Sequence, residues 1–157
     1  MIQFKTLSLA VGALFVVLSA TSNLLAQEDV IAKRKAIMRE NNDSVSKVFK
    51  KAVEEKDYAT IELKAKDIMK GMEAIPNLFP QGVTDAKSRA HPDIWAKSDD
   101  FKNRATNARK AAEALSKAAA AKNDTEINAK VKDLGSNREG ACGDCHKIYR
   151  TDFRKDG

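Results

Sequence analysis

The chain has 157 residues, of which 28 are basic and 22 acidic, so its formal net charge is +6. This length provides one small domain with a single modest core. Charges of both signs are interspersed and no nucleic-acid-binding motif occurs, which argues against a nucleic-acid partner. Acidic proteins or an anionic membrane surface remain as partners for a mildly basic protein.

Residues 1–26 have the pattern of a secretory signal peptide. Lys5 gives a positive start, an apolar run extends from Leu7 to Ala20, and a more polar stretch ends at Ala26. We expect cleavage after Ala26, which leaves 27–157 as the mature domain. Lys5 is lost with the leader, so 27 basic and 22 acidic residues give a net charge of +5. The apolar run is short for a membrane span, so we expect no stable anchor after cleavage; an uncleaved anchor is the alternative.

The mature sequence predicts an all-α fold, an antiparallel four-helix bundle. The first helix is expected over 29–53 with Asp29 as its N-cap, because apolar residues repeat every seven positions, at Ile31, Met38, Val45 and Ala52. The second helix is expected over 58–73 with Asp57 as its N-cap. Its apolar stripe comprises Ile61, Ala65, Ile68 and Met72.

A long irregular stretch, 74–97, contains all three prolines and is expected to pack on the domain through its large apolar side chains. The third helix should begin with Ser98 as its N-cap and present an alanine-rich inner face. The fourth helix should begin near Asp124, loosen over 135–140, and end near Phe153. The alanines allow helices, or a flat cofactor, to approach closely.

The segment Cys142-Gly143-Asp144-Cys145-His146 has the spacing C-x-x-C-H, which is the attachment signature of a c-type haem. Two thiols three residues apart on a helix project from one face, where each can add to a vinyl group of the porphyrin. His146 follows Cys142 by one helical turn, so its imidazole can ligate the iron. We therefore predict one covalently bound haem c per chain.

Two other interpretations of this motif remain open. A structural zinc site needs four protein ligands, and the sequence has no second C-x-x-C pair and no H-x-x-x-H pair to supply them. A disulfide or free dithiol between Cys142 and Cys145 is the other alternative, since an unmodified pair in the oxidising periplasm would tend to close. No strand pattern precedes the motif, which argues against a thioredoxin-like site.

The mature chain resembles the cytochrome c′ family. The stretch Cys-x-x-Cys-His-x-x-Tyr-Arg ends at Tyr149 and Arg150 and is similar to that family's C-terminal pattern. The segment HPDIWAKSDDF, 91–101, resembles the family's Pro-x-Ile-Trp before a Phe, and EDVIAKRKAIMRENN resembles its first helix. The resemblance implies a four-helix bundle with the haem motif on its last helix.

The resemblance also implies roles for residues outside the motif. Met38 occupies the position of the distal iron ligand in the low-spin branch, the cytochrome c-556 type, although ordinary core packing is the alternative for a methionine on this seam. Arg34 lies one turn before Met38, where the family places an arginine near a haem propionate. Arg150 follows His146 by four residues and is expected near the proximal face. A solvated helix charge is the alternative for each arginine.

From these features we expect a periplasmic c-type cytochrome that carries single electrons with His146 and Met38 as axial ligands, and not an enzyme. Its partners are expected to be acidic redox proteins, and the resemblance implies that a homodimer forms in some relatives. Two alternatives are kept. One is a five-coordinate cytochrome c′ that binds nitric oxide or carbon monoxide; the other is a haem-free helical protein of the envelope.

Overall fold

The computed structural model describes residues 29–83, 88–136 and 138–153. The predicted signal peptide, 1–26, lies outside these ranges. Within them the chain forms helices and no strand; the single β-bridge joins Ala90 to Arg150. The elements are a first helix over 29–43, η1 (Ser44–Val48, a π-helical turn), α2 (Phe49–Glu54), α3 (Tyr58–Ala74), η2 (Ile75–Leu78), α4 (Asp93–Ala96), α5 (Ser98–Ala120), α6 (Asp124–Leu134), α7 (Gly140–Tyr149) and η3 (Thr151–Phe153).

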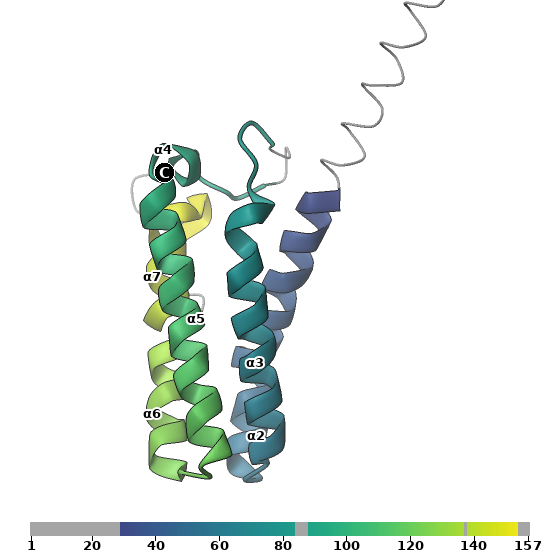
Figure 1. The fold of residues 1–157 in the computed structure, drawn as a ribbon, viewed down its shortest axis with the longest axis vertical. Coiled ribbons are helices and arrows are strands. Elements are labelled where there is room, and N and C mark those ends of the chain that lie inside the picture. Colours follow the sequence, from purple (N-terminus) through teal and green to yellow (C-terminus); the bar gives the residue numbers. More distant parts are fainter. Residues whose placement is uncertain (1–28, 84–87, 137, 154–157) are drawn as a thin grey trace, which may run out of the picture.

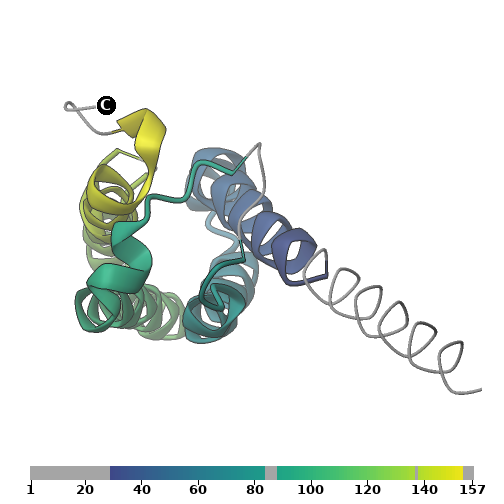
Figure 2. The ribbon, with the colours of Figure 1, turned by 90° about the horizontal axis from the view of Figure 1, so that it is seen from above.

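The long elements form a four-helix bundle, as the sequence predicts (Figure 1). The first helix continues through η1 and α2 to make one corner, α3 and α5 make the next two, and α6 with α7 makes the fourth. Seen along the bundle in Figure 2, α7 lies at the corner between α5 and the first helix. At the other end α2 contacts α6, so the bundle closes there.

The most deeply buried side chains of this bundle are aliphatic apart from Phe49. Its largest fully buried side chains are Phe49, Ile61, Ile68, Ile75, Leu115, Ile127 and Leu134. Alanines from α5, including Ala108 and Ala112, are also buried and let α5 approach α3 closely. Burial of this apolar surface supplies most of the free energy that holds the helices together.

Two similar turns begin α3 and α6. Lys56 and Lys122 adopt positive φ angles of 54° and 52°, and the next residue in each case caps a helix. Asp57 accepts a hydrogen bond from the Thr60 N–H at 3.0 Å, and Asn123 accepts one from the Glu126 N–H at 3.1 Å. These are side-chain caps of the kind that satisfy the first amide groups of a helix. The prediction of Asp57 as a cap is confirmed.

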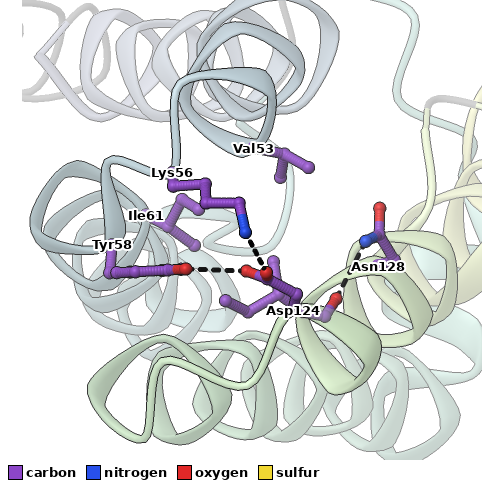
Figure 3. A pocket seen from close by; sticks show the side chains of 7 residues that line it. Val53, Lys56, Tyr58, Ile61, Asp124 and Asn128 are labelled. Carbon is purple, nitrogen blue, oxygen red and sulfur yellow. Dashed lines mark hydrogen bonds and ion pairs between the residues drawn. The ribbon is translucent and has the colours of Figure 1, made fainter.

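The two turns are also tied to each other at the closed end of the bundle. Asp124 accepts hydrogen bonds from Lys56 Nζ at 2.7 Å and from the Tyr58 hydroxyl at 2.8 Å, beside a small pocket of about 150 Å³ (Figure 3). These donors hold the pKa of the Asp124 carboxyl below its ordinary value. The link therefore joins the α2–α3 hairpin to the α5–α6 hairpin far from the haem motif.

Two sequence predictions need correction. Ser98 is the first residue of α5 and not its N-cap; Lys97 holds that position, and its side chain makes no capping hydrogen bond. The predicted fourth helix is two helices, because α6 ends at Leu134 and α7 starts only at Gly140. The first helix is interrupted by the π-turn η1, although its overall extent agrees with the prediction.

The stretch between α3 and α5 packs on the domain as expected. The Trp95 indole N–H donates to the carbonyl oxygens of Phe79 at 3.0 Å and Pro80 at 3.2 Å. The main chain around Ala90 pairs with the end of α7: the His91 N–H donates to the Tyr149 carbonyl at 2.9 Å. This segment thus covers the open end of the bundle, next to the haem motif.

Candidate haem site

A cavity of about 800 Å³ lies at the open end of the bundle. It is lined by side chains from the first helix, α3, α5 and α7, and from the segment between α3 and α5. Its lining includes Met38, Met72, Phe79, Cys142, Cys145 and His146. The volume falls within the range of about 300–1,000 Å³ that is typical of ligand pockets. The structure therefore brings both cysteines, the motif histidine and the predicted distal methionine to one cavity.

Helix α7 gives the motif its geometry. Cys142, Cys145 and His146 lie on consecutive turns of one helix, so their side chains share the face toward the cavity. Gly135 ends α6 with a φ of 74°, and Gly140 begins α7 with a φ of 60°, angles that most side chains avoid. The motif thus enters the bundle on a separate, short helix.

Gly143, for which we predicted no role, packs closely against the preceding backbone. A Cβ atom at this position would lie 2.2 Å from the carbonyl carbon of Arg138. The backbone that precedes α7 therefore folds against the helix at a point where only glycine fits. The sequence carried no signal for this contact, because the position is one of the two variable residues of the motif.

The two thiols are free and largely buried. Burial raises the pKa of the Cys142 thiol to about 11 and that of the Cys145 thiol to about 12. The positive charge of the nearby Arg104 lowers the pKa of the Cys145 thiol, but the effect of burial is larger. A thiol–disulfide catalyst needs a lowered thiol pKa to supply thiolate at neutral pH. The environment of these cysteines is therefore unlike that of a redox-active dithiol.

The wall opposite α7 belongs to the first helix. Met38 is half-buried and lies one turn after Arg34, whose side chain is only 4% exposed. Arg34 donates from Nη2 to the Ser88 hydroxyl at 3.3 Å, and its Cζ lies 4.6 Å from the centre of the Phe79 ring. The guanidinium is therefore held in place within the cavity wall, and Arg34 is not a solvated helix charge.

Arg150 also lines the cavity and is held by an ion pair. Its Nε and Nη2 atoms donate to the two carboxylate oxygens of Asp152 at 3.0 and 2.7 Å, a bidentate arrangement. Arg89, from the segment before α4, donates to the same carboxylate at 3.0 Å. Asp152 thus fixes two arginines at the edge of the cavity. The predicted placement of Arg150 near the motif agrees with the structure.

The other candidate ligands are placed differently. Met72 is buried and lines the cavity from α3, whereas Met69 packs against the core outside it. His91 does not line the cavity; its Nδ1 accepts a hydrogen bond from the Asp93 N–H at 3.1 Å and so serves the start of α4. Among the described residues that line the cavity, Met72 is therefore the one methionine that competes with Met38 for the role of distal iron ligand.

An aromatic row and a hydrogen-bonded triad meet at Tyr149 of α7, and the sequence did not reveal either. The rings of Phe79, Phe101 and Tyr149 make two edge-to-face contacts, each with 5.2 Å between centroids. The buried Tyr149 hydroxyl donates to Asp100 at 2.6 Å, and Arg104 Nε donates to the same carboxylate at 2.7 Å. Arg104 reaches further, to the Asp144 carbonyl at 3.2 Å. The triad ties α7 to the start of α5.

The triad predicts a pH-dependent contribution to stability. Hydrogen bonds from Arg104, and then from Tyr149, hold the pKa of the Asp100 carboxyl below its ordinary value. Because this lowered pKa favours the ionised carboxylate in the folded protein, Asp100 stabilises the fold at pH values above its pKa in the unfolded chain. This contribution is lost as the pH falls through the pKa that Asp100 has in the folded protein. We expect Asp100→Asn to lower the Tm of the haem-loaded protein at pH 7, and the difference from wild type to shrink toward pH 3.

Asp99→Asn is the control for this prediction. Asp99 neighbours Asp100 on the same helix, but its side chain is 94% exposed. Its replacement should change Tm little at either pH. Equal losses for both variants, or a loss for Asp100→Asn that is as large at pH 3 as at pH 7, would contradict an ionic contribution of the triad.

Two surveys of the described ranges bear on the alternatives. No group of three or more His, Cys, Asp and Glu side chains within them is arranged to hold a metal ion. Likewise, none of the helices that the structure describes is long and apolar enough to cross a membrane.

Comparison with known proteins identifies the fold. Residues 29–150 match the family model described as Cytochrome C′. The chain belongs to the cytochrome c′ family. It is 34% identical over 129 residues to a cytochrome c-554 from Cereibacter sphaeroides, covering 78% of this chain and 81% of that protein. It is 30% identical to a cytochrome c-556 from Agrobacterium fabrum, covering 94% of this chain and 96% of that protein.

A solved structure of the same fold confirms the bundle. A nitric oxide complex of a variant of cytochrome c prime from Alcaligenes xylosoxidans superposes with a TM-score of 0.64 at 23% identity, over 79% of this chain and 94% of that chain. Proteins of the cytochrome c′ family carry covalently attached haem c with its iron, and so does this chain. The cavity suits this group: it is large, it holds two thiols and an imidazole on one wall, and Phe79, Phe101 and Tyr149 supply apolar surface.

Proposed function

We propose that this chain is a periplasmic carrier of single electrons, with haem c held between α7 and the first helix. Cys142 and Cys145 would form the two thioether bonds, His146 would be the proximal ligand, and Met38 the distal ligand. The observation that supports this most strongly is that Met38, on the first helix, and His146, on α7, line one cavity. When bound in this way, haem c supplies a one-electron ferric–ferrous couple.

The side chains around the cavity would fix the redox couple. Imidazole and thioether ligation raises the reduction potential, because the soft sulfur favours ferrous iron. Arg34 would pair with a propionate, since its guanidinium is already held in the cavity wall by Ser88 and Phe79. Phe79, Phe101 and Tyr149 would exclude water from the proximal side. With both axial side chains supplied by the protein, oxidation and reduction require little change in geometry.

A gas-binding protein is the second candidate, and a specific observation favours it. The nitric oxide complex from Alcaligenes xylosoxidans has the same bundle. Such a function needs an open distal side or a distal ligand that leaves easily. The haem-free envelope protein is not proposed, because proteins of this family carry haem c.

Exposure of the reduced protein to carbon monoxide separates these two functions. We expect the wild-type protein to react slowly or incompletely, because Met38 would occupy the distal position. Met38→Leu should react rapidly and completely under the same conditions. This variant is the control that shows whether carbon monoxide can enter the cavity. Rapid and complete reaction of the wild-type protein, at the rate of the variant, would favour gas binding over electron transfer. The measurement is the change in the visible spectrum with time after mixing.

A further inference from the structure

Asn41 places a polar amide in the wall of the large cavity. It lies on the first helix, three residues after Met38, and lines the same cavity. The residue is only 9% exposed. Within the described ranges, no hydrogen bond joins its side chain to another group of the protein. Buried amides are normally hydrogen-bonded and an unpaired one costs free energy, so we expect its partner among the groups that meet in the loaded cavity.

The surroundings of the amide leave the cavity as the side on which it can bond. On the other side it lies against α3: a Cβ atom at Gly71 would lie 3.6 Å from Asn41 Oδ1 and 3.7 Å from Nδ2. The Gly71 carbonyl oxygen is already used, because it accepts a hydrogen bond from the Ile75 N–H. The two helices also approach closely here, since the same Cβ atom would lie 2.8 Å from Ile37 Cγ2. A bonding partner for the amide therefore has to come from the cavity.

The position of Asn41 along the first helix favours one partner. Arg34, the proposed partner of a propionate, lies seven residues earlier, which is about 10 Å along the helix axis. Met38 lies only three residues earlier, or about 4.5 Å. Side chains of a helix lean toward its N-terminus, so the Asn41 amide extends toward the turn that carries Met38. An amide N–H is a donor and a thioether sulfur is a weak acceptor, so the two groups are complementary.

We propose that Asn41 is a positioning residue for the distal ligand: its Nδ2 donates a hydrogen bond to the Met38 thioether when that sulfur is bound to iron. The proposal rests on the electron-carrier function above, because it requires Met38 to be the ligand. The hydrogen bond restricts rotation of the thioether and adds to the free energy needed to move the sulfur off the iron. Asn41 thereby favours a six-coordinate electron carrier over a site that opens to gases.

The test is the reaction of the reduced, haem-loaded protein with carbon monoxide, which requires the Met38 sulfur to leave the iron. Asn41→Leu keeps the size of the side chain and removes the N–H donor. We expect this variant to react about fivefold faster than wild type, as the loss of one neutral hydrogen bond predicts. Asn107→Leu is the matched control, because Asn107 is exposed on α5 and lies outside the lining of the cavity. It should react at the wild-type rate.

The same substitution in a Met38→Leu background separates positioning of the sulfur from access to the cavity. With no thioether to hold, Asn41→Leu should leave the rate of this background unchanged. A similar acceleration in both backgrounds would overturn the proposal, because Asn41 would then control entry to the cavity or contact carbon monoxide itself. An unchanged rate when Asn41 alone is replaced would also overturn it.

A methyl spectrum of the ferrous protein labelled with ¹³C-methyl methionine gives a second readout. The Met38 resonance should shift in Asn41→Leu, because the thioether loses its fixed orientation, and should stay in place in Asn107→Leu. A low-spin wild-type protein whose Met38 resonance and reaction rate are both insensitive to Asn41→Leu refutes the hydrogen bond and leaves the electron carrier intact. A high-spin wild-type protein refutes ligation by Met38 and the role of Asn41 together.

Discussion

Met38→Leu is expected to convert the haem-loaded protein from low spin to high spin in both oxidation states. Leucine keeps the size and apolar character of the side chain but removes the sulfur, so the proposed distal ligand is lost while the packing of residue 38 against the core is largely retained. The visible spectra of the ferric and ferrous proteins report the change. The reduction potential should fall by an amount on the order of 0.1 V, within the range of about 0.8 V that axial ligands control.

Met72→Leu provides the matched control for this substitution. Met72 lines the same cavity, carries the same thioether and is more deeply buried than Met38, but it comes from α3. It should remain low spin, with a small change in stability, since exchange of methionine for leucine usually costs less than about 1.5 kcal/mol. If Met72→Leu becomes high spin and Met38→Leu does not, the distal ligand is on α3. If neither changes, no methionine of the cavity is a ligand.

Replacing both cysteines, Cys142→Ala with Cys145→Ala, is expected to abolish covalent attachment of haem. These are the only two cysteines in the chain, so no other thiol can form a thioether. Each single substitution should retain one covalent bond and is the control for the double variant. The measurement is intact mass after expression in a host that matures c-type cytochromes. A double variant whose mass still includes haem after extraction with acidified organic solvent would contradict the assignment.

The double variant should also lose much of its stability. Haem c would cover the apolar side chains that line the cavity of about 800 Å³, and without it these side chains are exposed to water. We expect the apoprotein to unfold well below the Tm of the haem-loaded protein, or to collapse around the empty site. Thermal unfolding followed by circular dichroism measures this loss.

Much of the fold followed from local patterns. The helices at 29–54 and 58–74 agree with the predicted ranges because their apolar residues repeat at helical spacing and Asp57 is a strong N-cap. The position of Met38 near the motif followed from the resemblance and from its place on the inner seam. Arg34 lay on the same face, and its deep burial, at 4% exposure, supports a role in the cavity.

Other features depend on contacts between distant segments, which sequence spacing does not encode. The break between α6 and α7 depends on the backbone at Gly135 and on the close approach of Arg138 to Gly143. The triad formed by Tyr149, Asp100 and Arg104 joins positions on two helices.

The most direct test of iron ligation by Met38 is a methyl spectrum of the ferrous protein labelled with ¹³C-methyl methionine. Met38, Met69 and Met72 are the three methionines of the predicted mature chain. We predict one methyl resonance far upfield of the usual methyl range, as ring-current shifts above a haem require, present in wild type and in Met72→Leu and absent in Met38→Leu. Three methyl resonances at ordinary positions in the wild-type protein would contradict the proposed ligation.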